Sequence, residues 1–299
     1  MTTAAAAPVC PVCGDGDPEL YLEEGPERLE ASAIGSSRRT VTPGRVLRCR
    51  ECRLGFRQTR AGAAELAGLY RRMDTSMYEA ELAGRRRTAA RHLRIVERYA
   101  QRGRLLDVGC ASGLFLLRAV AAGWQVAGVE PSESLWRQAR EALAGSGEVH
   151  CATLEEAGLP AGSFDAVTLW DVLEHVPDPV GFLRACTALL KPGGHLFLNV
   201  PDLESPEARL MGRRWPLLLP EHLNYFTRGS LRLCADKAGL EWRAFGRRAV
   251  WFSAEYVLYR LAQHRIAGAA LLHGMARASG LGRLSVPVWL GESYGVWRC

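Results

Sequence analysis

Short apolar runs alternate with helix-like runs from residue 104 onward, and this alternation constrains the fold more than any other feature. The runs at 104–109, 125–130, 164–171 and 194–200 have the length and apolar content of buried strands, and the stretches between them favour helices. Parallel strands need such crossovers, and the helices then cover both faces. The sequence therefore predicts an α/β fold built on a parallel sheet. Further along, the pattern predicts a helix at 228–238, a strand at 241–247, a helical pair at 252–280 and a strand at 292–298.

Four of the nine cysteines form two C-x-x-C pairs, Cys10 with Cys13 and Cys49 with Cys52. Two such knuckles supply four thiolates for a closed, tetrahedral zinc site, whose role is structural. No export signal is visible, so the spacing favours metal ligation in a reducing cytoplasm over disulfides. The alternative is four unrelated reduced cysteines. Residues 1–60 are thus predicted to form a zinc-ribbon-like module that binds Zn²⁺.

A glycine-containing loop follows the first predicted strand and opens the next predicted helix. It reads Asp107-Val-Gly109-Cys-Ala-Ser-Gly113, and Glu130 ends the second strand. Glycines let the backbone approach a ligand, and an acid at the end of the second strand accepts ribose hydroxyls. The G-x-G-x-x-G fingerprint of a dinucleotide site is absent. The loop and Glu130 therefore suit a ligand with a ribose, and the loop lacks the fingerprint of a diphosphate site.

The pattern Asp-x-Gly-x-x-x-Gly, with an acid ending the second strand, resembles motif I of class I S-adenosylmethionine-dependent methyltransferases. The resemblance continues through "SFDAVTLWDVLEHVPDP" at 163–179 and "LLKPGGHLFLNVP" at 189–201. It covers residues 104–299 and implies a Rossmann-like, seven-stranded sheet with S-adenosylmethionine as cofactor. Two positions depart from the common pattern: Ala111 stands in the glycine loop, and Thr153 stands where many members place an acid.

The resemblance also implies which residues contact the cofactor. Asp107 would hold the methionine amino group, and Glu130 would bind the ribose diol. The remaining implied contacts are the loop residues Gly109, Cys110 and Gly113, the adenine neighbours Thr153 and Leu154, and Trp170 and Asp171 at the methionine end.

Residues 220–227 read "PEHLNYFT" and lie in a segment, 203–228, that is expected to cover the methyl acceptor. Methyltransferases with an N-terminal four-cysteine module and an E-H-x-x-Y-F segment include deoxysugar C-methyltransferases, which this chain resembles. The resemblance makes His222 a candidate base, with Glu221 to orient it or to raise its pKa. The alternative is a folding motif. His175, after the fourth strand, is a second candidate whose alternative role is to fix a loop.

The predicted function is methyl transfer from S-adenosylmethionine to an oxygen or carbon of a small molecule, in secondary-metabolite biosynthesis. Residues 61–103 are expected to form a helical lid or linker. The net charge of +6 comes almost entirely from arginine and is weak evidence for nucleic acid. An RNA base methyltransferase and a non-catalytic cofactor-binding module remain the alternatives. No run of about 20 apolar residues predicts a membrane span, and the oligomeric state stays open.

Overall fold

The computed structural model of the 299-residue chain describes residues 8–24, 44–57, 68, 71, 82–263 and 268–299. Its strands form two sheets, one of seven strands and one of four. Most of the 61–81 part of the expected lid lies outside the described residues; the rest of that segment contains helix α3 (Leu82–Tyr99). Within the described residues, no helix is both long enough and apolar enough to span a membrane.

The large sheet has the strand order β10-β11-β8-β7-β4-β5-β6. The four pairings from β8 to β6 are parallel, whereas β11 is antiparallel to both β8 and β10. The order reverses beside β4, which is where ligands bind in open α/β sheets. The predicted seven-stranded fold is confirmed. The strands are β4 (Arg104–Val108), β5 (Gln125–Val129), β6 (Gly147–His150), β7 (Phe164–Trp170), β8 (Leu190–Pro201), β10 (Glu241–Ser253) and β11 (Ser285–Arg298).

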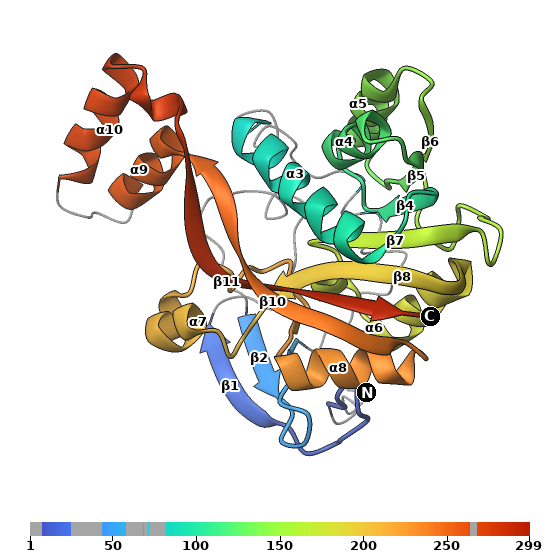
Figure 1. The fold of residues 1–299 in the computed structure, drawn as a ribbon. Coiled ribbons are helices and arrows are strands. Elements are labelled where there is room, and N and C mark those ends of the chain that lie inside the picture. Colours follow the sequence, from blue (N-terminus) through green and yellow to red (C-terminus); the bar gives the residue numbers. More distant parts are fainter. Residues whose placement is uncertain (1–7, 25–43, 58–67, 69–70, 72–81, 264–267) are drawn as a thin grey trace.

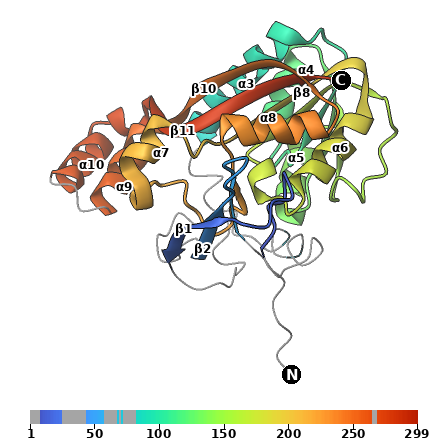
Figure 2. The same ribbon diagram turned by 90° about the horizontal axis from the view of Figure 1, so that it is seen from below.

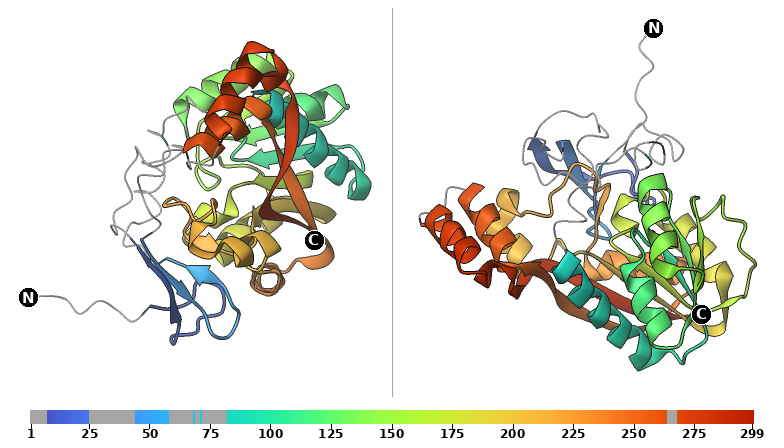
Figure 3. Two further views of the ribbon diagram at one scale, coloured as in Figure 1. Left: turned by 90° about the vertical axis from the view of Figure 1, so that its left-hand side faces the viewer. Right: turned by 90° about the horizontal axis from the view of Figure 1, so that it is seen from above.

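Helices cover both faces of this sheet, and each face has its own apolar core (Figures 1 and 3). Side chains alternate along β4, so Leu105 packs with the α3, α4 and α5 face and Leu106 with the α6 and α8 face. Because both faces of the strand are buried, the side chains on both of its faces are apolar. The covering helices besides α3 are α4 (Leu114–Ala121), α5 (Glu133–Leu143), α6 (Pro179–Leu189) and α8 (Arg228–Lys237).

The N-terminal sheet has the order β1-β2-β3-β9 and is antiparallel throughout. Its first three strands are β1 (Glu19–Glu24), β2 (Gly44–Arg48) and β3 (Gly55–Phe56). The fourth, β9 (Asn224–Tyr225), comes from the "PEHLNYFT" segment, and Gly55 pairs with Tyr225. Lys237 of α8 donates to the Val12 carbonyl at 2.8 Å, so the turn at Cys10–Cys13 lies beside α8, while β1 and β2 lie outside the large sheet (Figure 2). The module is thus joined to the main body through a shared strand.

Two long strands carry a helical hairpin away from the sheet. β10 and β11 stay paired as far as Ser253 and Ser285, and α9 (Ala254–Gln263) and α10 (Ala269–Ala278) follow at their far end (Figure 1). Both strands are longer than the runs 241–247 and 292–298 predict. The segment between β8 and α8 contains α7 (Pro206–Met211) and a 3₁₀ turn at Gly212–Arg214, and further 3₁₀ turns occupy Leu173–His175 and Leu281–Arg283.

Candidate active site

The loop between β4 and α4 places backbone at the point where the strand order reverses. Gly109 and Gly113 have φ values of 73° and 76°, in the left-handed region that favours glycine. A Cβ at Gly109 would lie 2.8 Å from Val172, so a larger residue would also collide. Ala111 adopts a φ of 47°, at a strain of about 1 kcal/mol. The backbone geometry of the glycine loop is therefore retained at Ala111.

Two buried carboxylates flank this loop. Thr168 Oγ1 donates to Asp107 at 2.6 Å, and the backbone N–H of Ala111 donates to Glu130 at 2.9 Å. The N–H of Ser132 donates to the other Glu130 oxygen at 2.8 Å. Burial raises the pKa of both Asp107 and Glu130 to about 7. Both acids stand at the carboxyl ends of adjacent strands, ready to accept hydrogen bonds from a ligand.

The other predicted cofactor residues differ in what they offer. The Cys110 thiol is buried in the α4 side of the core, next to Leu116 and Gly128, so only its backbone faces the loop. Leu154 is buried in the opposite core. The backbone N–H of Thr153 donates to the Glu156 carboxylate at 3.0 Å. Glu156 was not singled out from the sequence. None of these three residues presents a charged group.

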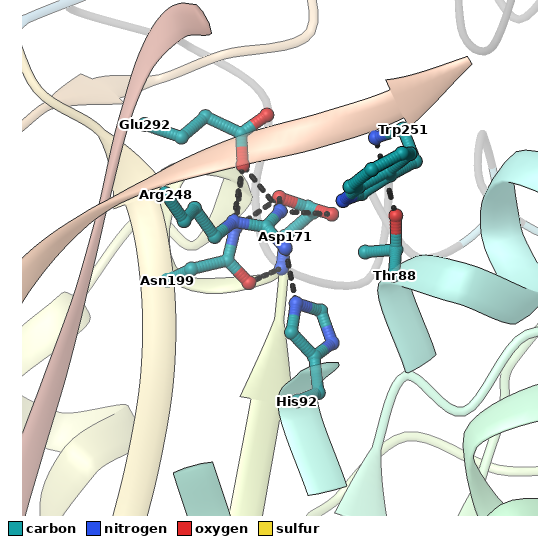
Figure 4. Close-up of polar contacts among 7 residues, drawn as sticks. All are labelled: Thr88, His92, Asp171, Asn199, Arg248, Trp251 and Glu292. Atoms are coloured by element: carbon teal, nitrogen blue, oxygen red, sulfur yellow. Dashed lines mark hydrogen bonds and ion pairs between the residues drawn. The ribbon is translucent and has the colours of Figure 1, made fainter. Parts of the chain in front are cut away.

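Asp171, directly after β7, belongs to a polar network that the sequence did not reveal (Figure 4). Trp170 stacks on His92 of α3, with ring centroids 3.8 Å apart. Arg248 of β10 donates to His92 Nε2 and lies 3.3 Å from the Asp171 carboxylate. The network also includes Asn199 of β8, which donates to both carboxylates, and Glu292 of β11, which accepts from Arg248 Nε at 2.7 Å.

The network holds Asp171 in place while leaving it accessible. The side chains of Arg248 and Glu292 are 8% and 9% exposed, whereas that of Asp171 is 53% exposed. Asp171 has a φ of 58°, an unusual value for aspartate outside αL caps. The buried ion pair therefore fixes a strained, solvent-facing carboxylate at the end of β7.

Replacing Arg248 with methionine is expected to destabilise the fold by about 3–5 kcal/mol, because it leaves the buried Glu292 carboxylate without its cation. Urea unfolding of the full chain measures this. Arg247→Met is the matched control, since Arg247 pairs with Glu207 on the surface and its loss should cost about 0–1 kcal/mol. Equal midpoints for the two variants would contradict the assignment of a buried ion pair.

A second polar cluster lies beyond Asp171. His175 and His222 have ring centroids 4.8 Å apart, and the buried Glu174 carboxylate lies beside them. Burial lowers the pKa of both histidines and raises that of Glu174, with a further rise from the Asp171 charge. The cluster lies next to the end of β7, because Glu174 and His175 belong to the 3₁₀ turn that follows this strand. The sequence named both histidines but missed Glu174, which is adjacent to His175.

Glu221 lies in the same region, but it contacts His175 through its backbone carbonyl. His175 Nδ1 donates to the Glu221 carbonyl at 3.0 Å, and His222 Nδ1 donates to the Leu217 carbonyl at 2.9 Å. The partner that orients the His222 ring is thus a carbonyl. Tyr225 and Thr227 of the same segment act structurally: the Tyr225 hydroxyl donates to the Leu219 carbonyl, and Thr227 caps α8.

The four predicted metal ligands come together in the N-terminal module. The Cys10 and Cys52 sulfurs are 3.6 Å apart, and those of Cys13 and Cys49 are 3.3 Å apart. Tetrahedral Zn–S bonds of about 2.3 Å require sulfurs about 3.8 Å apart, so the cluster needs only a small expansion. The donor set fits Zn²⁺.

The strand order and the glycine loop define the class I fold of S-adenosylmethionine-dependent methyltransferases. Residues 79–244, more than half of the chain, match the methyltransferase domain family, and the chain therefore belongs to it. The YcgJ protein of Bacillus subtilis superposes with a TM-score of 0.50 at 15% identity, over 70% of this chain and 97% of that one. That likeness shows the fold alone.

Sequence relatives cover less of the chain. A ubiquinone biosynthesis O-methyltransferase of Xanthomonas axonopodis pv. citri is 45% identical over 100 residues, 32% of this chain and 42% of the relative. The protein of the same name from Aromatoleum aromaticum is 43% identical over 149 residues, 46% of this chain and 64% of the relative. The matched part thus spans less than two thirds of the length of these relatives.

Proposed function

We propose that the chain transfers the methyl group of S-adenosylmethionine to an oxygen or carbon of a small-molecule acceptor, in the biosynthesis of a secondary metabolite. One observation carries the proposal: Asp107 and Glu130 stand at the carboxyl ends of β4 and β5, and the Glu174–His175–His222 cluster stands at the turn that follows the neighbouring strand β7. A cofactor between them would direct its methyl group towards the imidazoles. The names of the sequence relatives support oxygen as the acceptor atom.

The cofactor assignment follows from the loop and its flanking acids. Glu130 accepts from the ribose hydroxyls, and Asp107 with Asp171 holds the methionine ammonium group. Bound S-adenosylmethionine supplies the methyl group as a reactive sulfonium, so positioning of the acceptor is the main task of the protein. The remaining proposed contacts are Gly109, Cys110 and Gly113 along the loop, Thr153 and Leu154 at the adenine, and Trp170 at the methionine end.

The acceptor side is assigned to the 203–228 segment and the turn after β7. His222 and His175 contact the reacting group of the acceptor, and Glu221 positions His175 through its carbonyl. Because α7 and "PEHLNYFT" lie on the same connection, this insertion also shapes the pocket for the acceptor. A Zn²⁺ ion at Cys10, Cys13, Cys49 and Cys52 holds the N-terminal module against it. The proposal includes the division of the chain into a zinc-ribbon-like module at 1–60, a helical lid or linker at 61–103 and a methyltransferase domain at 104–299.

The test is release of S-adenosylhomocysteine by the full chain with a panel of phenols, hydroquinones, sugar nucleotides and ribosomal RNA. We expect turnover with at least one small molecule and none with RNA. His222→Gln is expected to lower kcat by at least about 100-fold while the cofactor Kd stays within about twofold of wild type. Turnover with RNA alone, or with no member of the panel despite cofactor binding, would overturn the proposal.

A further inference from the structure

Three ligand-type side chains converge at the turn after β7. One nitrogen from each of His175 and His222 and one carboxylate oxygen of Glu174 lie within 4.8 Å of one another. Glu174 and His175 belong to the 3₁₀ turn that follows β7, and His222 precedes β9. The N–H of Leu223 donates to the Glu174 carbonyl at 2.8 Å. The two segments that supply the cluster are therefore fixed to each other by backbone.

Backbone carbonyls set the tautomer of both imidazoles. Nδ1 of His175 and Nδ1 of His222 each lie within hydrogen-bond distance of a carbonyl oxygen, at 3.0 and 2.9 Å. A carbonyl oxygen only accepts, so Nδ1 carries the proton in each ring and Nε2 carries a lone pair. An Nδ1–H bond to a carbonyl is also the arrangement that orients histidine ligands in metal sites. The two Nδ1–H bonds therefore orient each ring so that Nε2 is the atom that would ligate a metal.

The third member of the cluster is a buried acid. Glu174 is 1% exposed, and among the described residues its Oε2 has no hydrogen-bond partner. The nearby guanidinium of Arg248 is engaged by Glu292 and Asp171. A buried carboxylate oxygen without a donor costs several kcal/mol. A cation bound by this oxygen and the two imidazole lone pairs would remove that cost.

We propose that Glu174, His175 and His222 bind a divalent transition-metal ion, with Zn²⁺ as the first candidate. Two imidazoles and one carboxylate suit Zn²⁺ or Fe²⁺, whereas Mg²⁺ and Ca²⁺ take oxygen ligands. Metal bonds of about 2.0–2.2 Å place tetrahedral ligands about 3.3–3.6 Å apart, so the side chains must close by about 1 Å. Three protein ligands leave a coordination position open to the acceptor, unlike the closed four-cysteine site.

The catalytic role of this ion deepens the proposed function and rests on it. An acceptor hydroxyl at the open position loses its proton to water more readily, because the ion lowers the pKa of a bound oxygen. The oxygen then attacks the methyl carbon, the C–O bond forms, and the C–S bond breaks with its electron pair remaining on sulfur. The site therefore selects acceptors with a phenol, hydroxyl or enol oxygen.

The experiment measures metal content and turnover of the full chain after loading with Zn²⁺ and removal of excess ion. Elemental analysis is expected to find two ions per chain in wild type and one in Glu174→Gln and in His222→Gln. His195→Gln is the matched control and keeps both ions, because His195 lies on β8 outside the cluster. The glutamine variants should bind S-adenosylmethionine with a Kd within about twofold of wild type, which shows that they fold.

Two results would overturn the metal site: one ion per chain in wild type after loading with Zn²⁺, Fe²⁺, Mn²⁺ or Co²⁺, or two ions in both cluster variants. If wild type binds only one ion and His222→Gln still loses turnover, the His222 imidazole acts on the acceptor directly, without a metal ion. Metal content is read without an acceptor, so the two proposals fail separately. If the wild-type chain binds two ions but transfers no methyl group, the proposed function is wrong. If it transfers a methyl group with only one ion bound, the metal site is wrong.

Discussion

Glu130→Ala is expected to weaken binding of S-adenosylmethionine by about 10²- to 10³-fold. The carboxylate of Glu130 stands at the end of β5 with both oxygens placed by backbone amides of the loop and of the next turn. Each hydrogen bond from a ribose hydroxyl to a charged acceptor is worth about 1.5–3 kcal/mol. Loss of two such bonds amounts to at least about 3 kcal/mol, and titration calorimetry on the full chain measures it.

Two further variants separate charge from shape. Glu130→Gln keeps the size of the side chain and one acceptor oxygen, so its Kd should fall between those of wild type and Glu130→Ala. Glu133→Gln removes a carboxylate from the exposed surface of α5, where it pairs with Arg137, and should leave the Kd unchanged. Cofactor binding by Glu130→Ala at wild-type affinity would show that the ribose lies elsewhere.

Cys49→Ser is expected to abolish zinc binding at the four-cysteine site and to unfold the N-terminal sheet. Structural zinc supplies about 10–16 kcal/mol in zinc-finger peptides, which is comparable to the whole stability of a domain. The two-residue strands β3 and β9 bury little surface of their own, so the metal must supply most of the stability. Hydrogen exchange should show loss of protection in β1, β2 and β3.

The control for this variant is Cys299→Ser, which changes an exposed cysteine outside the cluster. It should keep the zinc and the protection of the N-terminal sheet. Because β9 pairs with β3, Cys49→Ser should also lower turnover, through a displaced His222, while the cofactor Kd changes by less than about threefold. Full protection of β1 to β3 in zinc-free Cys49→Ser would argue that packing alone holds the module.

The order of the elements was predictable because each one carries its own local signal. The strands β4, β5, β7 and β8 each contain an apolar run, and glycine or proline follows the helices between them. The lengths of β10 and β11 were not predictable from such signals. Trp251 to Ser253 pair with residues across the α9–α10 hairpin, beyond the edge of the neighbouring strand. The extension is apolar at 249–252 and 286–290, but no local signal shows that these two runs pair with each other.

The candidate site divides in the same way. Asp107 and Glu130 follow strands at fixed spacing, so sequence alone places them on the ends of neighbouring strands. The network around Arg248 draws its members from α3, β7, β8, β10 and β11, and no spacing along the chain links them. Glu174 was missed for a different reason: its role depends on a fold that turns the carboxylate inward beside two imidazoles.

The pairing of β3 with β9 also sets an order of events during synthesis. Gly55 leaves the ribosome 170 residues before its partner Tyr225. At about 5–20 residues per second, the N-terminal module waits roughly 10–30 seconds with its β3 edge unpaired. An open strand edge invites pairing with other chains. Early binding of zinc by the four cysteines would fix the first three strands during this interval. The exposed edge is then limited to the two-residue strand β3 until β9 pairs with it.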